Sequence, residues 1–256
     1  MLTAALYLCA AFAPTALRAP ASRVSTSSLR MSDDKVVVKE YFNNEGFDRW
    51  SRIYSDDGEV NKVQLDIRDG HQQTVDKILK WIDDDADLSG KTVCDAGCGV
   101  GSLALPLAQR GAKVEASDIS EAMVNEASRR AAMGSFKTMP KFTPSDLSAL
   151  SGKYDTVTCV DVMIHYPTEE MAGMVKHLAS LADRRLIISF APKTWYYDLL
   201  KKVGELFPGP SKTTRAYLHP EEDVVTALRE AGFELRRTEM TGTNFYFSRL
   251  LEAVRS

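Results

Sequence analysis

The sequence predicts an α/β fold: a doubly wound, mostly parallel seven-stranded sheet with an antiparallel last strand. Short apolar segments alternate with longer segments in which apolar residues recur at helical spacing, the pattern of strands joined by crossover helices. Three glycines at alternating positions, Gly97, Gly99 and Gly101, follow the first short segment, as in open sheets that bind ligands at their carboxyl edge. We expect an N-terminal helical arm over residues 33–90 and a main domain over residues 91–256, with a lid inserted at about 193–218.

The elements follow from apolar spacing, taken in chain order. Helical spacing over residues 35–42 and 59–81 places two helices before the sheet. The parallel strands are expected at residues 92–94, 113–116, 141–143, 156–160 and 186–190. The helices between them are expected at residues 102–110, 120–132, with Ser120 as N-cap, and 169–181. A helix at 220–231 then leads to two last strands, at 234–240 and 245–253, that close the sheet as an antiparallel pair.

The composition excludes several classes of protein. With 256 residues, 44% hydrophobic and 26% charged, the chain is neither disordered nor collagen-like. A formal net charge of −3 lacks the positive excess that neutralises phosphates, so we expect no nucleic-acid partner. The four cysteines form neither a disulfide framework nor a zinc motif, which favours a reducing compartment.

Residues 1–32 have the composition of a targeting leader. The first 30 residues contain no Asp, Glu or Lys, and their apolar run at 2–13 is shorter than the ~20 residues that span a bilayer. Ala-Ala-Phe-Ala-Pro at residues 10–14 resembles the cleavage context of algae with plastids of red-algal origin, where a signal peptide precedes a transit peptide. We expect a chloroplast or complex plastid, in the stroma or associated with the thylakoid or envelope membrane; a simple transit peptide or a frayed N-terminus is the alternative.

The turn after the first predicted strand carries the chemistry. Its alternating glycines let the backbone turn sharply and approach a ligand closely, because a Cβ there would collide with it. Such loops also bind NAD or serve as structural turns. The spacing GxGxG, with Asp95 two residues ahead, departs from GxGxxG, whose third glycine lets a helix close over a pyrophosphate. We therefore expect a nucleotide-like cofactor without a pyrophosphate.

Acidic residues also follow the later strands. Asp118 ends the second strand, where a carboxylate accepts hydrogen bonds from both ribose hydroxyls; an acid favoured by a helix N-terminus is the alternative. Asp146 follows the third strand and is placed to accept from an adenine amino group, with the backbone of Leu147 beside it. Asp161 follows the fourth strand. Since parallel strands end at one edge, we expect these acids to face one ligand site.

The glycine loop, Asp118, residues 145–147 and the segment after the fourth strand together resemble class I S-adenosylmethionine-dependent methyltransferases, whose sheet is Rossmann-like. The flanking residues 41–54, 66–72 and 161–167 are similar to the magnesium-protoporphyrin IX methyltransferase family of chlorophyll synthesis. This similarity extends over nearly all of residues 35–256. It implies S-adenosyl-L-methionine as cofactor, S-adenosyl-L-homocysteine as product, and magnesium protoporphyrin IX as substrate. Contact with the magnesium-inserting chelatase is implied by the family alone.

The implied reaction esterifies one propionate of the porphyrin. A propionic acid has a pKa near ~4.3, so the nucleophile is ionised at neutral pH and needs no general base. Alignment of carboxylate oxygen, methyl carbon and sulfur, with water excluded, is then sufficient for catalysis. Magnesium is expected only inside the substrate, because the sequence shows no ligand set for it.

The resemblance also assigns residues. Asp95 and the three glycines would hold the methionine end of the cofactor, Asp118 the ribose and Asp146 the adenine, whereas Arg68 would pair with the cofactor's carboxylate or be an exposed helix arginine. The remaining cofactor contacts are expected at Cys98, Ile119, Leu147 and Val160. For the acceptor we expect His165 and Tyr54, with Tyr41 as the rival tyrosine. The other three histidines, His71, His177 and His219, are interpreted as surface or capping residues.

Several alternatives remain at this point. The aromatic and cationic segment 195–218 fits a lid over the macrocycle or a surface that contacts the plastid membrane. Cys98 lies in the cofactor loop, which raises the hypothesis of redox control. A methyltransferase acting on a quinone or phenol would share every cofactor residue. A nicotinamide dehydrogenase has the wrong glycine spacing, and a cofactor-binding partner without catalysis is a further alternative.

Overall fold

The computed structural model describes residues 36, 38–44, 46–47, 61–85, 88–193 and 217–256. The predictions for the leader, for Tyr54 and for nearly all of the insertion therefore lie outside the described residues. Among the described residues, no helix has the length and apolar character needed to cross a membrane.

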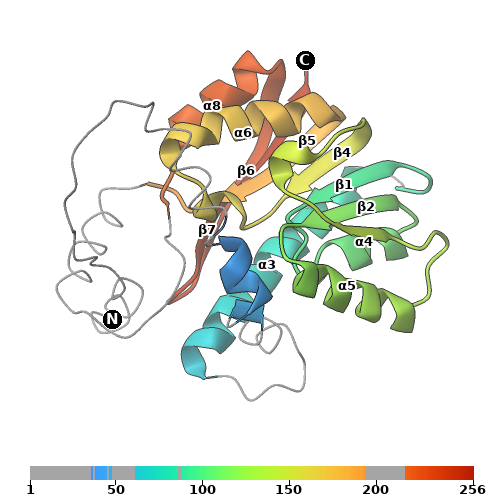
Figure 1. The fold of residues 1–256 in the computed structure, drawn as a ribbon. Helices are drawn as coiled ribbons and strands as arrows, with labels where there is room; N and C mark the ends of the chain where they lie inside the picture. The colour runs from blue at the N-terminus through green and yellow to red at the C-terminus, as the bar shows by residue number, and fades with distance from the viewer. Residues whose placement is uncertain (1–35, 37, 45, 48–60, 86–87, 194–216) are drawn as a thin grey trace, which may run out of the picture.

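One seven-stranded sheet forms the centre of the fold, in the order β3-β2-β1-β4-β5-β7-β6 (Figure 1). All neighbouring pairs from β3 to β5 are parallel, and β7 runs antiparallel between β5 and β6, as predicted. The strands are β1 (Thr92–Ala96), β2 (Lys113–Asp118), β3 (Lys141–Pro144), β4 (Tyr154–Cys159), β5 (Ala182–Phe190), β6 (Phe233–Gly242) and β7 (Phe247–Arg255).

Helices cover both faces of the sheet. In Figure 1, α6 and α8 lie side by side on one face, and α3, α4 and α5 lie on the other. The helices are α3 (Lys62–Asp85), α4 (Ala104–Gln109), α5 (Glu121–Met133), α6 (Thr168–Leu181) and α8 (Glu221–Glu230), with short 3-10 helices η1 (Leu147–Ala149) and η2 (Met163–His165). Two apolar clusters, one on each face, hold these layers together.

The central strands are buried on both faces, which explains their continuous apolar sequence. Leu186, Ile187 and Ile188 of β5 are fully buried, with alternate residues packing into the two clusters. Full burial of such side chains stabilises the fold by roughly 1.5–3 kcal/mol each. This rigid centre places the carboxyl ends of β1, β2 and β4 at one edge, where the sequence predicted the site.

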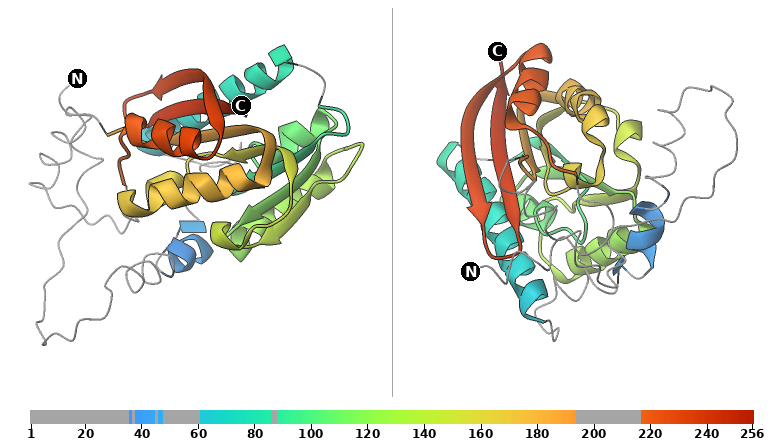
Figure 2. Two further views of the ribbon diagram at one scale, coloured as in Figure 1. Left: turned by 90° about the horizontal axis from the view of Figure 1, so that it is seen from above. Right: turned by 90° about the vertical axis from the view of Figure 1, so that its left-hand side faces the viewer.

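The helix α3 belongs to the same core as the sheet. Its residues Val75, Ile78, Leu79, Trp81 and Ile82 are buried in the second cluster. Both views in Figure 2 show the last two strands at one edge of the sheet, and α3 packs against this pair. The arm boundary at residue 90 stays a prediction. The packing shows that α3 covers part of one face of the sheet.

The N-terminal segment 38–44 docks beside the start of α5. Ser120 caps α5 as predicted, since its Oγ accepts from the N–H of Met123. The same Oγ lies 3.0 Å from Phe42 O and 2.9 Å from Asn43 Oδ1. Asn43 Oδ1 also accepts from the N–H of Ala122 at 3.3 Å. One helix terminus thereby holds the arm next to the carboxyl edge of the sheet.

Candidate cofactor and acceptor site

Asp95 is a buried carboxylate with one unsatisfied oxygen. It lies at the end of β1 and is 2% exposed. Its Oδ1 accepts from Thr158 Oγ1 at 2.7 Å, Oδ2 is buried with no hydrogen-bond partner of normal geometry, and the backbone N–H of Ala104 at the start of α4 lowers the pKa of the carboxyl. Burial raises the pKa of Asp95 to about 6, and the charge of Asp118 adds to that rise against the Thr158 hydrogen bond. A buried oxygen of this kind calls for a donor, and an ammonium group of a ligand would satisfy it.

The glycine loop has the backbone geometry that the sequence predicted. Gly97, Gly99 and Gly101 all have positive φ, at 81°, 51° and 86°. A Cβ on Gly97 would lie 2.2 Å from Val162 Cγ2, so only glycine fits there. A Cβ on Gly99 would meet no protein atom within 4 Å. The backbone therefore leaves room beside Gly99 for a ligand to approach, while the N–H groups of Gly97 and Cys98 are held by Ser117 O.

Asp118 connects the glycine loop to the helix α5. Its Oδ2 accepts from the N–H of Gly99 and its Oδ1 from the N–H of Ser120, both at 2.9 Å. Burial raises the pKa of Asp118, and these two N–H donors oppose that rise. The contact with Ser120 supports the alternative of a helix N-terminal acid, and the carboxylate still has acceptor capacity for ribose hydroxyls.

The predicted adenine residues follow β3 at the same edge. Asp146 caps η1, since its Oδ1 accepts from the N–H of Ser148 at 2.8 Å and from the Ser148 hydroxyl. Leu147 has its side chain in the apolar core, so only its backbone is placed to meet a ligand. Ile119 is partly exposed and Val160 is nearly buried, one residue beyond the ends of β2 and β4. Their contact with adenosine stays a prediction.

Cys98 lies in the loop but has none of the properties of a reactive thiol. It is 7% exposed, and burial raises its pKa well above the ordinary value. Its Sγ lies 3.6 Å from Gly99 O. Because the thiolate is the reactive form, this environment opposes the redox-control hypothesis.

Arg68 lies on α3, three residues before His71. Its side chain is 29% exposed, and its Nε lies 3.9 Å from Asp69 Oδ1, a distant and solvated pairing. It is neither a fully exposed helix arginine nor a buried ion pair. A planar guanidinium in this position suits the carboxylate of a ligand.

His165 ends η2, just beyond β4. Its ring packs edge-on against Phe42 of the N-terminal arm, with centroids 5.3 Å apart and an interplanar angle of 79°. Burial lowers the pKa of His165 to about 4, although the charge of Asp161 opposes this. The imidazole is therefore neutral at neutral pH and offers a polar N–H rather than a charge. Tyr41, the rival tyrosine, contacts Phe42 at 5.1 Å between ring centroids.

Two histidines are not the surface or capping residues that the sequence interpretation expected. His219 is fully buried, and its Nε2 lies 2.9 Å from Met163 O, so it holds η2 in place. His71 is part-buried, and its Nδ1 lies 2.8 Å from Asp161 Oδ2, 90 residues away. His177 is half-buried on α6. The sequence could not have shown these contacts, because a lone histidine carries no information about a partner that is distant along the chain.

Asp161 differs from the other strand-end acids in having four side-chain partners. Its carboxylate turns toward α3 and the last strands, where it accepts from His71, Ser189, Tyr246 and Ser248. Sequence reasoning missed this network, because its members are separated by tens of residues. Within the described part of the chain, no group of three or more His, Cys, Asp or Glu side chains could hold a metal ion.

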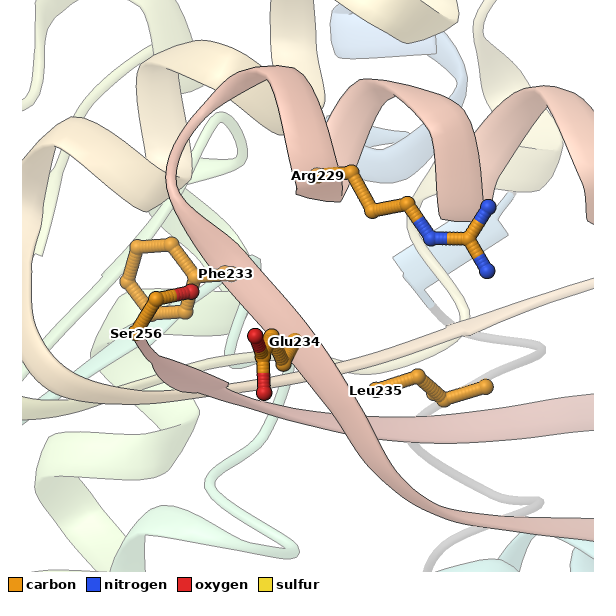
Figure 3. A pocket seen from close by; sticks show the side chains of 5 residues that line it. All are labelled: Arg229, Phe233, Glu234, Leu235 and Ser256. Atoms are coloured by element: carbon orange, nitrogen blue, oxygen red, sulfur yellow. The ribbon is translucent and has the colours of Figure 1, made fainter.

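One surface hollow is remote from these residues. Figure 3 shows Arg229, Phe233, Glu234, Leu235 and Ser256 around it, at the end of α8 and the start of β6. Because β6 runs in the same direction as β5, this hollow lies at the opposite edge of the sheet from Asp95 and Asp118. It takes no part in the site.

Comparison with known proteins agrees with this geometry. A methyltransferase-domain family matches residues 93–184, and a family described as the magnesium-protoporphyrin IX methyltransferase C-terminus matches residues 159–255. The magnesium-protoporphyrin O-methyltransferase of Synechocystis is 62% identical over 225 residues, which cover 88% of this chain and 97% of the relative. The chloroplastic magnesium protoporphyrin IX methyltransferase of Arabidopsis thaliana is 58% identical over 222 residues, which cover 86% and 71%.

A solved structure shares the fold as well. The crystal structure of magnesium protoporphyrin IX methyltransferase from Synechocystis, with bound S-adenosylhomocysteine, superposes with a TM-score of 0.79 at 59% identity. The match covers 88% of this chain and all of that chain.

Proposed function

This chain belongs to the magnesium-protoporphyrin IX methyltransferase family, and on that premise we propose its reaction in terms of the described residues. It is an S-adenosylmethionine-dependent O-methyltransferase. It transfers a methyl group to a propionate carboxylate of magnesium protoporphyrin IX and gives the monomethyl ester.

The observation that supports the cofactor most is the unsatisfied Oδ2 of Asp95. It lies at the head of a loop in which Gly99 leaves open space on its ligand side. The ammonium group of the cofactor's methionine part fits that oxygen, and Asp118 fits the ribose hydroxyls. Arg68 would pair with the carboxylate, and Asp146 with Leu147 would contact adenine. The residues present therefore fit S-adenosylmethionine.

The chain's own residues act by binding and orientation. When bound, the cofactor supplies a methyl group made electrophilic by its sulfonium. His165, neutral at neutral pH, donates a hydrogen bond to a propionate oxygen and keeps the carboxylate from rotating away. Phe42 packs on that imidazole and helps to exclude water. Because the positive sulfonium and the negative carboxylate become neutral products, a dry site favours the reaction.

The proposal extends to the compartment of the protein and to its further contacts. The relative from Arabidopsis is chloroplastic, and the acid-free composition of residues 1–30 supports import into a plastid. We place the mature protein in the stroma, with segment 195–218 acting as a lid or a membrane contact. Tyr54 is proposed to bind the propionate with His165, and a contact with the magnesium-inserting chelatase is proposed from the family alone.

A labelled-methyl assay tests the function. The purified chain is expected to convert magnesium protoporphyrin IX to a labelled monomethyl ester, and His165→Ala to lower kcat at least tenfold while calorimetry shows unchanged affinity for S-adenosylhomocysteine. His177→Ala, on α6, is the matched control and should leave kcat unchanged. Label transfer to a quinone or phenol but not to the porphyrin would overturn the substrate assignment, and full turnover by His165→Ala would overturn the role of that histidine.

A further inference from the structure

Asp161 has an unusual backbone conformation. Its φ is +60°, and among the described residues no other non-glycine residue has positive φ. This region is unfavourable for residues with a Cβ, although Asp tolerates it better than most. Such a conformation persists only where the surroundings hold it. Something must therefore fix Asp161 at the end of β4.

The carboxylate provides that fixation, because both of its oxygens accept two side-chain hydrogen bonds. Oδ1 accepts from Ser189 Oγ at 2.8 Å and from Ser248 Oγ at 3.1 Å. Oδ2 lies 2.8 Å from His71 Nδ1 and 2.7 Å from Tyr246 Oη. Burial by itself would raise the pKa of Asp161, but these donors outweigh burial and hold it below its ordinary value. The carboxylate is thus an ionised acceptor.

The four donors come from three separate elements. His71 lies on α3, Ser189 on β5 and Ser248 on β7, and Tyr246 precedes β7. Tyr246 reaches Asp161 only because its ring lies on Gly70, where a Cβ would be 2.4 Å from Tyr246 Cδ1. The glycine inside α3, unfavourable for helix propensity by about 1 kcal/mol, is therefore explained by this contact.

The fixed backbone of Asp161 is followed within four residues by His165, the residue proposed to bind the propionate. Val162 follows Asp161, and its carbonyl accepts the N–H of His165 at 3.0 Å. The far side of the same turn is held by His219 at Met163 O and by the N–H of Tyr217 at Ile164 O. Asp161 supplies the anchor on the β4 side. The glycine loop has its own support, since Ser117 O holds the N–H groups of Gly97 and Cys98, and it touches the turn where Val162 packs against Gly97.

We propose that Asp161 is a positioning residue for methyl transfer: its four-donor carboxylate network orients the turn 162–165 so that His165 meets the propionate. The inference rests on the proposed function. It predicts an effect on kcat through His165 that is larger than the effect on cofactor affinity.

A double-mutant cycle tests the proposal. Asp161→Gly accepts the positive φ but removes the carboxylate, and we expect kcat to fall at least tenfold, with a smaller change in the Kd for S-adenosylhomocysteine through the contact of Val162 with Gly97. Asp161→Asn, which tolerates positive φ and keeps an acceptor oxygen, should restore most of kcat. Asp161→Gly combined with His165→Ala should be no slower than His165→Ala alone, because both changes disable one unit. The proposal would be overturned if Asp161→Gly lowered kcat by the same factor in the His165→Ala variant as in the wild type.

A milder pair covers the case in which Asp161→Gly does not fold. Tyr246→Phe keeps the ring on Gly70 and removes one donor, and it should lower kcat severalfold with the same dependence on His165. Tyr154→Phe is its matched control, since it removes a hydroxyl-to-carboxylate bond, to Glu115 Oε2 at 2.8 Å, at the other end of β4. Without cofactor or substrate, Tyr246→Phe should shift the imidazole NMR signals of His165, and Tyr154→Phe should not. Unshifted signals with unchanged kcat would overturn the inference, whereas an inactive wild-type chain with shifted signals would count against the proposed function alone.

Discussion

Three aspartates at the ends of neighbouring strands have different chemistry because their partners differ. Asp95 and Asp118 have raised pKa values, whereas Asp161 has a lowered one. The difference follows from the number of donors around each buried carboxylate. Sequence position placed all three at one edge, but the partners of Asp95 and Asp161 come from distant residues, whereas Asp118 is bonded by the nearby Ser120. The position of each acid after a predicted strand therefore indicated where it lies, but not whether it is protonated.

If Asp95 binds the ammonium group as proposed, we predict that cofactor affinity depends on pH. Without cofactor its pKa is about 6 because of burial; a bound ammonium group favours the ionised form and lowers that value. Above pH 6 the carboxylate is ionised in both states, so affinity is constant. Below pH 6 the free protein holds a proton that binding must release, so affinity falls by up to about tenfold per pH unit.

Calorimetric titration of S-adenosylhomocysteine between pH 5 and 8 measures this dependence. Asp95→Asn should bind more weakly at pH 8 and lose the decrease below pH 6. The matched control is Asp183→Asn, an exposed carboxylate paired with Lys153 at 4.0 Å. A wild-type affinity that stays flat down to pH 5 would show that Asp95 does not face the ammonium group.

The glycine loop gives a second residue-level prediction. Gly99→Ala meets no protein atom, so we expect near-normal stability apart from about 1–2 kcal/mol for the positive φ, together with a large loss of cofactor affinity. Gly90→Ala is the control, because Gly90 also has positive φ and open space but precedes β1 at the opposite edge. Thermal unfolding and calorimetry of both variants check this. Equal cofactor affinity in the two would mean that the space beside Gly99 is not the ligand's.

At the scale of elements, helical and strand periodicity predicted each described strand and helix of the sheet to within a few residues. The largest boundary differences are four residues, at the start of β5, predicted at 186 and observed at Ala182, and at the end of α3, predicted at 81 and observed at Asp85. The last turn of α3 continues because Asp85 pairs with Arg185 and Arg237 of the sheet, partners that no local pattern reveals. The glycine at position 70 was the available signal that another residue approaches α3 closely.

The docked arm yields a prediction at this scale. Asn43 Oδ1 accepts from Ser120 Oγ and from the N–H of Ala122, so Asn43→Ala should loosen segment 38–44 on α5, leaving the contact of Ser120 Oγ with Phe42 O, while Ser120 still caps the helix. We expect faster proteolysis within the arm and lower turnover, because Phe42 packs less firmly on His165, with little change in the unfolding free energy of the sheet.

The adjacent asparagine is a control for this experiment. Asn44 is exposed, and its Nδ2 donates only within the arm, to Glu40 O at 2.9 Å, among its described contacts. Asn44→Ala should leave the cleavage rate and turnover near those of wild type. Equal effects of the two substitutions would show that the contact with α5 does not hold the arm.

For the whole molecule, the sequence predicted the class of fold and the glycine loop at the end of β1, because alternation and glycine spacing are local signals. It did not predict which distant residues complete them. His71 and Asp161 are 90 residues apart, and Tyr246 joins them only because α3 packs on the last strands. The insertion of β7 between β5 and β6 brings these parts together. Such contacts exist only once the sheet has closed.

A buried ion cluster at the opposite edge holds this arrangement. Glu252 of β7 is fully buried and pairs with Arg185 of β5, at 3.2 Å between Nε and Oε1, and with Arg237 of β6. Asp85 of α3 pairs with the same two arginines. The cluster therefore joins α3 to three strands. Its loss should lower the free energy of unfolding of the whole sheet.

Glu252→Gln removes the central charge and leaves Arg185, only 4% exposed, with one carboxylate partner fewer. Because Asp85 still pairs with Arg185 while one charge-assisted contact is lost, we expect a loss of about 1.5–3 kcal/mol in the free energy of unfolding, measured by urea denaturation. Lys153→Met breaks an exposed pair with Asp183 and should cost less than about 1 kcal/mol. If the two variants unfolded at the same urea concentration, the ion cluster would not be what holds β7 between β5 and β6.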